Sequence, residues 1–185
     1  MLNLPNLLSF FRIALVPVLA LAIYLPFAGN NILATGIFFM ISITDWLDGW
    51  IARRFNQTTK FGAFLDPVAD KICVAVVLVL VVAKNTEPWL ALPIALIIAR
   101  ELIVSGLREW MAGLGKRSIV AVGWIGKWKT GVQFSAIGCL LFREPIGPFP
   151  TYEVGVALLL IAAALAIWSM LLYLFSAWPV MRDSA

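Results

Sequence analysis

Residues 45–70 read D-W-L-D-G-W-I-A-R-R-F-N-Q-T-T-K-F-G-A-F-L-D-P-V-A-D, between two runs that are almost wholly apolar. The stretch holds four of the chain's ten acidic residues, Asp45, Asp48, Asp66 and Asp70. A carboxylate near a bilayer core is energetically unfavourable, and such a residue usually belongs to a functional site. This stretch therefore predicts a divalent-metal site at the end of a helical bundle.

The composition is that of a membrane protein. Hydrophobic residues make up 62% of the 185 positions, and the mean hydropathy is +0.96. Apolar runs of nearly membrane-spanning length predict an all-α, polytopic integral membrane protein that forms a single domain over residues 1–185. We expect a short interfacial helix within residues 1–12, with Arg12 reaching the headgroups, and six transmembrane helices at about 8–28, 31–52, 62–82, 88–110, 124–142 and 152–177.

The basic residues are distributed very unevenly between the two predicted faces. Only Lys84 and Arg143 fall on one face, and the other twelve Lys and Arg residues fall on the face that also carries both termini and the four aspartates. The positive-inside rule makes that second face cytoplasmic. A net charge of +4 could indicate a nucleic-acid partner, but its placement in short loops favours membrane topology and anionic substrates instead.

Two residue types restrict the chemistry. The chain has no histidine, so acid–base work falls to Asp, Glu, Lys, Arg or Tyr. Cys73 and Cys139 lie far apart inside apolar runs, which predicts small buried side chains rather than a disulfide or a metal site.

The spacing of the aspartates predicts how they act. Asp45 and Asp48 are three residues apart, and Asp66 and Asp70 are four apart, so each pair shares one helix face. Two antiparallel helix ends joined by a short connector would bring both pairs together, where they would repel one another. An oxygen-only ligand set of this kind suits two Mg2+ or Mn2+ ions, which could polarise a diphosphate and activate a hydroxyl.

Small and basic residues accompany this cluster. Gly49, Ala52 and Gly62 would leave a groove beside the carboxylates, and Arg53 could bridge phosphate oxygens, although small residues also serve ordinary helix packing. A second, basic set predicts a pocket for an anionic acceptor: Arg108, Lys127 and Lys129. The neighbouring Lys116 and Arg117 also fit topology signals or lipid headgroup contacts. For Glu101 we expect an ion pair with another helix.

The stretch fits D-x2-D-G-x2-A-R-x8-G-x3-D-x3-D position for position, which resembles the signature of the CDP-alcohol phosphotransferases. The resemblance implies attack of an alcohol hydroxyl on the diphosphate of a CDP-linked lipid, with release of CMP. It implies that the four aspartates bind the metals, that Asp70 is also the general base, and that Gly49, Ala52, Arg53 and Gly62 line the CDP pocket. It further implies a homodimer in a bacterial cell membrane, and the distribution of Lys and Arg predicts that the active site is on the cytoplasmic side.

Further stretches suggest the acceptor. N-L-P-N-L-L-S-F-F-R (3–12), A-R-E-L-I-V-S-G-L-R (99–108) and G-K-W-K-T (126–130) are similar to the branch of the family that joins CDP-diacylglycerol to sn-glycerol 3-phosphate. Ser9 stands where many members of that branch have Thr, which keeps the hydroxyl. The alternatives are another member of the family, which would make cardiolipin or phosphatidylinositol phosphate, and, from a different class, a cation transporter that uses the acidic cluster as an ion site.

Overall fold

The computed structural model describes residues 4–54, 60–85, 87–116, 119 and 124–183. Within helices, the side chains of residues 4–5, 46, 48–54, 60, 63, 124–127 and 183 also lie outside the description. The chain divides into two compact units. Unit 1 comprises Met1–Thr86 and Ile137–Tyr152, and unit 2 comprises Glu87–Ala136 and Glu153–Ala185.

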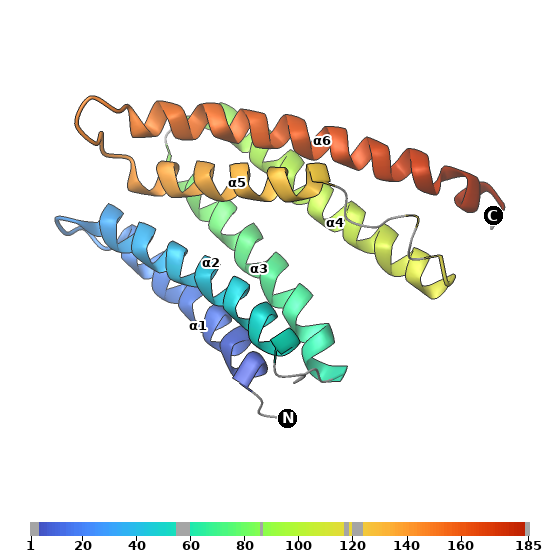
Figure 1. The fold of residues 1–185 in the computed structure, drawn as a ribbon. Coiled ribbons are helices and arrows are strands. Elements are labelled where there is room, and N and C mark those ends of the chain that lie inside the picture. The colour runs from blue at the N-terminus through green and yellow to red at the C-terminus, as the bar shows by residue number, and fades with distance from the viewer. Residues whose placement is uncertain (1–3, 55–59, 86, 117–118, 120–123, 184–185) are drawn as a thin grey trace. The chain divides into compact units, whose positions relative to one another are not determined.

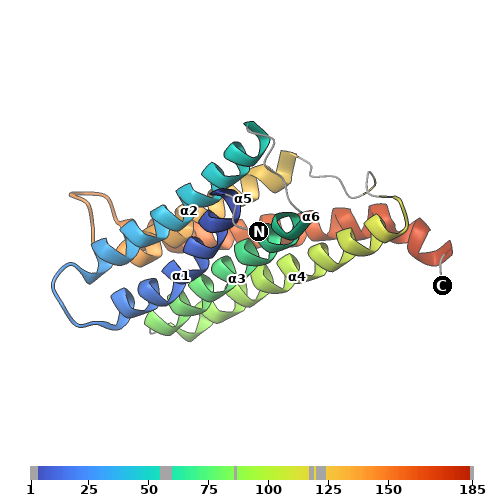
Figure 2. The same ribbon diagram turned by 90° about the horizontal axis from the view of Figure 1, so that it is seen from below.

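The described residues form helices, with one isolated bridge between Ile146 and Phe149 and no strand (Figures 1 and 2). This confirms the predicted all-α class. The elements are α1 (Leu4–Tyr24), α2 (Asn30–Arg54), α3 (Lys60–Lys84), the short 3-10 helix η1 (Pro88–Leu90), α4 (Ala91–Gly113), α5 (Trp124–Phe142) and α6 (Thr151–Asp183).

The N-terminal segment differs from the prediction. Residues from Leu4 onward belong to α1 without a break, so the expected short interfacial helix is not a separate element. Pro5 stands in the first turn of α1, where a missing N–H does no harm, and no turn residue follows it before the apolar run. The polar residues of this segment therefore continue the inner face of α1.

That inner face is one continuous stripe that changes character along the helix. The buried positions recur every three or four residues, as a helix face requires: Asn6, Ser9, Arg12, Val16, Leu19 and Ile23. α1 packs against both α2 and α3 within unit 1 (Figure 1). The apolar C-terminal half of α1 therefore packs against its neighbours. The polar N-terminal half faces Asp45 of α2 and Asp66 of α3.

The opposite ends of α2 and α3 are joined by polar contacts. The Lys84 ammonium at the end of α3 donates to the Asn31 side chain at the start of α2, and Asn31 Nδ2 donates to Glu144 Oε1 at 3.2 Å. Arg143, which follows α5, lies over the Tyr152 ring with 5.4 Å between guanidinium carbon and ring centroid. The only two basic residues predicted for the outer face thus lie at the same end of unit 1, away from Asp45 and Asp66.

Unit 2 contains an apolar cluster between α4 and α6. Its buried members are Val104, Leu107, Met111, Tyr173, Ala177 and Val180. The positions on each helix recur at three- or four-residue intervals, so each helix contributes one face. Tyr173 is the one polar-ended side chain of the cluster, and its hydroxyl reaches beyond it toward a set of charged residues.

Three described helices are long and apolar enough to cross a membrane: Asn6–Tyr24, Pro88–Gly113 and Thr151–Arg182. Large apolar side chains also project outward from them, for example Leu92 and Phe175. Such extensive exposed apolar surface indicates contact with lipid. Both cysteines are free, as predicted, and Cys73 is buried.

Candidate active site

Asp45 is held by an arginine from α1. Arg12 Nη1 donates to Asp45 Oδ1 at 2.6 Å. The Arg12 side chain is 1% exposed, whereas 43% of the Asp45 side-chain surface is exposed. The sequence prediction that Arg12 reaches the lipid headgroups is therefore wrong. Its guanidinium turns inward because a carboxylate on the neighbouring helix compensates the charge in an apolar setting.

Asp66, on α3, also has its hydrogen-bond partner on α1, one helical turn before Arg12. Ser9 Oγ donates to Asp66 Oδ1 at 2.7 Å, and Ser9 is fully buried. Because Ser9 and Arg12 are three residues apart on the inner face of α1, they direct one hydroxyl to α3 and one guanidinium to α2. α1 therefore orients an aspartate on each of its two neighbours.

The other two aspartates complete the predicted metal set. Asp70 is half-buried on α3, one helical turn after Asp66. The side chain of Asp48, on α2, lies outside the described residues. Among the side chains that are described, no group of three Asp, Glu or Cys residues is arranged to hold a metal ion. The convergence of all four carboxylates stays a prediction.

The predicted CDP pocket lies mostly outside the described part of the chain. Gly49, Ala52 and Arg53 belong to α2, and the structure describes nothing beyond their helical backbone. Gly62 is described and is buried in the first turn of α3. The assignment of these residues to a nucleotide pocket also stays a prediction.

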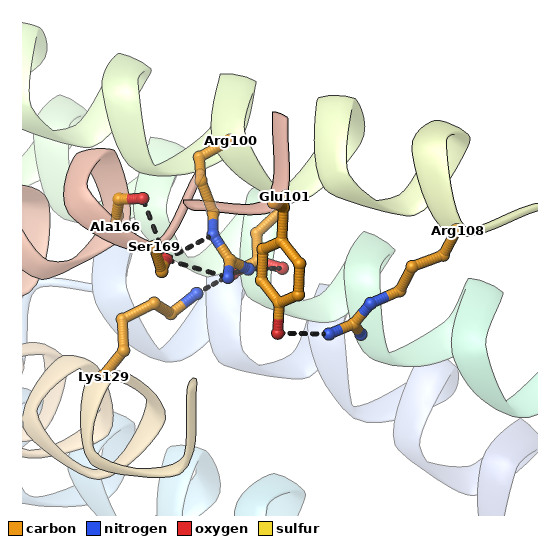
Figure 3. A network of polar contacts seen from close by, with 7 residues as sticks. Arg100, Glu101, Arg108, Lys129, Ala166 and Ser169 are labelled. Carbon is orange, nitrogen blue, oxygen red and sulfur yellow. Dashed lines mark hydrogen bonds and ion pairs between the residues drawn. The ribbon is translucent and has the colours of Figure 1, made fainter. Parts of the chain in front are cut away.

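Unit 2 carries the basic residues in a connected network (Figure 3). Arg108 Nη2, on α4, donates to the Tyr173 hydroxyl of α6 at 2.9 Å. The buried ammonium of Lys129, on α5, donates to Glu101 Oε1 of α4. The interhelical ion pair predicted for Glu101 is thus confirmed, with Lys129 as the partner. Lys127 lies outside the described side chains.

Arg100 extends this network. Its Nε and Nη2 donate to Ser169 Oγ of α6 at 3.2 and 3.0 Å. Its Nη1 lies 3.4 Å from both carboxylate oxygens of Glu101. Arg100 is buried, so its charge depends on these partners for compensation. Adjacent residues on a helix normally point in different directions. Here Arg100 extends to Ser169 of α6 and Glu101 extends to Lys129 of α5, and the two long side chains still contact each other.

Sequence reasoning missed five members of these two arrangements: Ser9, Arg12, Arg100, Ser169 and Tyr173. Ser9 and Arg12 had a detectable signal, because polar residues recur at helical spacing with Asn6 on α1. Ser169 and Tyr173 share a face of α6, but their partners lie 69 and 65 positions away in the chain. Nothing in the local pattern of α6 indicates those partners.

Comparison with known proteins identifies the family. The sequence profile described as CDP-alcohol phosphatidyltransferase matches residues 2–168. The chain belongs to this family. The predicted resemblance is therefore confirmed, and the matched segment includes every predicted site residue.

Close relatives share one name. A protein of Salmonella choleraesuis, named CDP-diacylglycerol–glycerol-3-phosphate 3-phosphatidyltransferase, is 54% identical over 95% of this chain and 94% of its own length. A Pectobacterium atrosepticum protein of the same name is 55% identical over the same shares of the two chains. One from Shigella flexneri is 53% identical over 98% of each chain. This family member is thus similar, over nearly its whole length, to proteins named for one reaction.

Proposed function

We propose that the protein transfers a phosphatidyl group from CDP-diacylglycerol to sn-glycerol 3-phosphate, giving phosphatidylglycerophosphate and CMP. The observation that carries this proposal is identity above 50% over at least 94% of both chains with relatives named for this reaction. The eight signature residues between Asp45 and Asp70 support the same chemistry. The net positive network of unit 2 supports an acceptor that already bears a phosphate, because inositol or glycerol would not need its charge.

The reaction exchanges one phosphate–oxygen bond for another. The acceptor hydroxyl oxygen attacks the phosphorus that carries the diacylglycerol, and the bond from that phosphorus to the bridging oxygen of the diphosphate breaks. The bridging oxygen leaves with the electron pair as part of CMP. We assign Asp70 as the general base that accepts the hydroxyl proton, since the chain has no histidine and Asp70 is half-buried beside the metal-site candidates.

The described aspartates have the donor chemistry for hard divalent cations. Asp45 and Asp66 offer carboxylate oxygens that are only partly covered, and each is oriented by one hydrogen bond from α1. We propose that they bind two Mg2+ or Mn2+ ions together with Asp48 and Asp70. When bound, such ions neutralise the diphosphate and polarise its phosphorus.

Arg12 and Ser9 fix the ligand geometry in this scheme. Arg12 holds one oxygen of Asp45, which leaves the second oxygen and the exposed edge of the carboxylate for a metal. Ser9 does the same for Asp66 through a neutral donor. In both cases the partner is buried and the carboxylate is partly open, as expected for supports behind a ligand set.

The remaining proposals concern the membrane topology, the domain organisation and the oligomeric state. We propose six transmembrane helices, a single functional domain over residues 1–185, cytoplasmic termini and active site, and a homodimer in the bacterial inner membrane. The span count rests on the six long helices of the described residues, three of which are long and apolar enough to cross a membrane, and the orientation rests on the uneven distribution of Lys and Arg. The single domain is supported by the family match, which runs through both compact units.

The test uses purified full-length protein in detergent, labelled CDP-diacylglycerol, and Mg2+ or Mn2+. Glycerol 3-phosphate, myo-inositol 1-phosphate, glycerol and phosphatidylglycerol serve as acceptors in parallel. We expect CMP release with glycerol 3-phosphate, loss of release with EDTA, and recovery on adding metal. A higher kcat/KM with another acceptor would overturn the assigned acceptor, and no release with any acceptor would overturn the proposed reaction.

A further inference from the structure

α6 contributes two buried polar residues that no motif accounts for. Ser169 and Tyr173 are 3% and 8% exposed and lie four residues apart, so they share one face of the helix. Both lie beyond residue 168, where the family match ends. The rest of this helix is dominated by Ala and Leu, so two polar groups on its inner face require an explanation.

Ser169 is an oriented acceptor for Arg100. Its hydroxyl donates to the Ala166 carbonyl at 3.0 Å, so its single proton is directed at the helix backbone. The lone pairs of Oγ therefore face the guanidinium, which donates to them from Nε and Nη2 (Figure 3). This arrangement fixes the plane of the Arg100 guanidinium without neutralising its charge.

Tyr173 holds the second arginine and also contacts the first. Its hydroxyl accepts a hydrogen bond from Arg108, and its ring centroid lies 5.0 Å from the guanidinium carbon of Arg108. The same ring lies 5.8 Å from the guanidinium carbon of Arg100. Arg100 and Arg108 are about 12 Å apart along α4 at 1.5 Å per residue, yet their side chains converge on one aromatic ring.

The network holds more positive than negative charge. Among its described contacts, the network of Arg100, Arg108 and Lys129 contains one carboxylate, that of Glu101. Arg108 Nε is buried and has no hydrogen-bond partner among the described residues. A buried N–H donor of a cationic group that has no hydrogen-bond partner favours an anionic oxygen as its partner.

We propose that Ser169 and Tyr173 are positioning residues for the acceptor phosphate. They hold the guanidiniums of Arg100 and Arg108 so that both charges, and the buried Nε of Arg108 that has no partner among the described residues, are directed at a phosphate-bearing acceptor. This inference rests on the proposed function, and it adds Arg100 and α6 to an acceptor site that the sequence assigned to Arg108, Lys127 and Lys129. It also gives α6 a role in acceptor selectivity.

The substitutions must separate positioning from packing, because Tyr173 also belongs to the apolar cluster between α4 and α6. Tyr173→Phe keeps the ring and removes the hydroxyl. Ser169→Ala removes the acceptor for Arg100, and Ser169→Thr restores it. Ser176→Ala is the matched control, because Ser176 is an exposed serine of the same helix whose hydroxyl donates to the Leu172 carbonyl.

Steady-state kinetics of the full-length protein in detergent tests the inference. Loss of hydrogen bonds to a charged group, one in Tyr173→Phe and two in Ser169→Ala, predicts about a 10–100-fold rise in KM for glycerol 3-phosphate in each variant. We expect kcat and the KM for CDP-diacylglycerol to stay near their wild-type values. Ser169→Thr should recover most of the loss, and Ser176→Ala should match the wild type. An unchanged KM for glycerol 3-phosphate in both variants would overturn the inference.

A binding measurement separates this inference from the proposed function. Glycerol 3-phosphate, but not glycerol, should raise the melting temperature of the wild type, and should raise that of Tyr173→Phe and Ser169→Ala much less. If the wild type is stabilised in this way but transfers no phosphatidyl group to glycerol 3-phosphate, the proposed reaction is wrong and the phosphate site stands. Equal stabilisation of wild type and both variants would leave Ser169 and Tyr173 with a packing role only.

Discussion

The acidic end of unit 1 and the basic network of unit 2 use the same device on opposite charges. In unit 1, the buried Arg12 and Ser9 of α1 hold carboxylates that stay partly open. In unit 2, Ser169 and Tyr173 of α6 hold guanidiniums that are largely buried, while Glu101 compensates Lys129. In unit 1, α1 orients one carboxylate on each of α2 and α3, and in unit 2, α6 orients two guanidiniums of α4.

The difference between the two regions lies in what remains available. Carboxylates supported from behind and open in front suit metal ligation, where position matters for the chemical step. Buried cations with excess positive charge suit recognition of an anion, where charge matters for binding. We therefore expect changes in unit 1 to lower kcat, and changes in unit 2 to raise the KM for glycerol 3-phosphate. The predictions below test that division.

The largest effect is expected for the aspartates of α3. Asp66→Asn and Asp70→Asn should each lower kcat by about a thousandfold or more, because each removes a ligand charge and Asp70→Asn also removes the base. CMP release from CDP-diacylglycerol measures this loss. Glu87→Gln, just before η1, serves as the control. Wild-type turnover in either aspartate variant, with normal insertion into the membrane, would contradict the metal-site assignment.

Arg12→Gln should have the next largest effect. Without the guanidinium, Asp45 loses its orienting partner, and we expect kcat to fall by about 10–100-fold, as is typical when a support behind a metal ligand is removed. Arg12→Lys should recover part of the activity, because it restores the charge without the planar geometry. The measurement is kcat at saturating substrates, with the melting temperature recorded alongside. A change confined to the KM for glycerol 3-phosphate would break the proposed division between the two units.

Lys129→Met tests the other side of the comparison. It removes a buried cation of the network, and we expect the KM for glycerol 3-phosphate to rise about tenfold, the effect of losing a hydrogen bond to a charged group. Lys116→Met is the matched control, since Lys116 is exposed in the connector after α4. A fall in kcat with unchanged KM would assign Lys129 to the chemical step instead.

The smallest effect is expected at Ser9. Ser9→Ala removes one neutral donor to Asp66, and a loss of kcat of about 2–10-fold follows from the usual strength of such a hydrogen bond. Ser9→Thr keeps the hydroxyl and should be close to wild type. The two variants are compared by CMP release under identical metal concentrations. Equal activity of Ser9→Ala and wild type would show that Asp66 needs no support from α1.

Much of the fold could be predicted from the sequence, because apolar runs of spanning length and Pro- and Gly-rich breaks locate helices well. The helices predicted at 62–82 and 124–142, for example, correspond to α3 and α5. The N-terminal helix was wrongly separated, since local polarity around residues 6–12 indicates an interface as readily as a buried polar face. The family was predictable because eight signature residues lie within one short stretch.

The partners of the site residues could not be predicted in the same way. Arg12 finds Asp45 across 33 positions, and Arg108 finds Tyr173 across 65. Such pairs depend on which faces of three helices meet, and helical periodicity specifies only the face of each helix. A long arginine side chain near a predicted helix end can extend either to lipid headgroups or to a carboxylate on a neighbouring helix. Because α1 packs against α2, Arg12 contacts Asp45.

The sequence alone determined the membrane class, the helix order, the family and the carboxylates available for metal binding, because these follow from composition and from spacing within single helices. The tertiary structure decided which buried groups support those residues. Residues 45–70 carry the signature, but Ser9 and Arg12 of α1 orient its aspartates. Arg100 and Arg108 owe their positions to α6 in the same way. A buried charge must be satisfied by whatever helix packs against it, and that neighbour is a property of the fold.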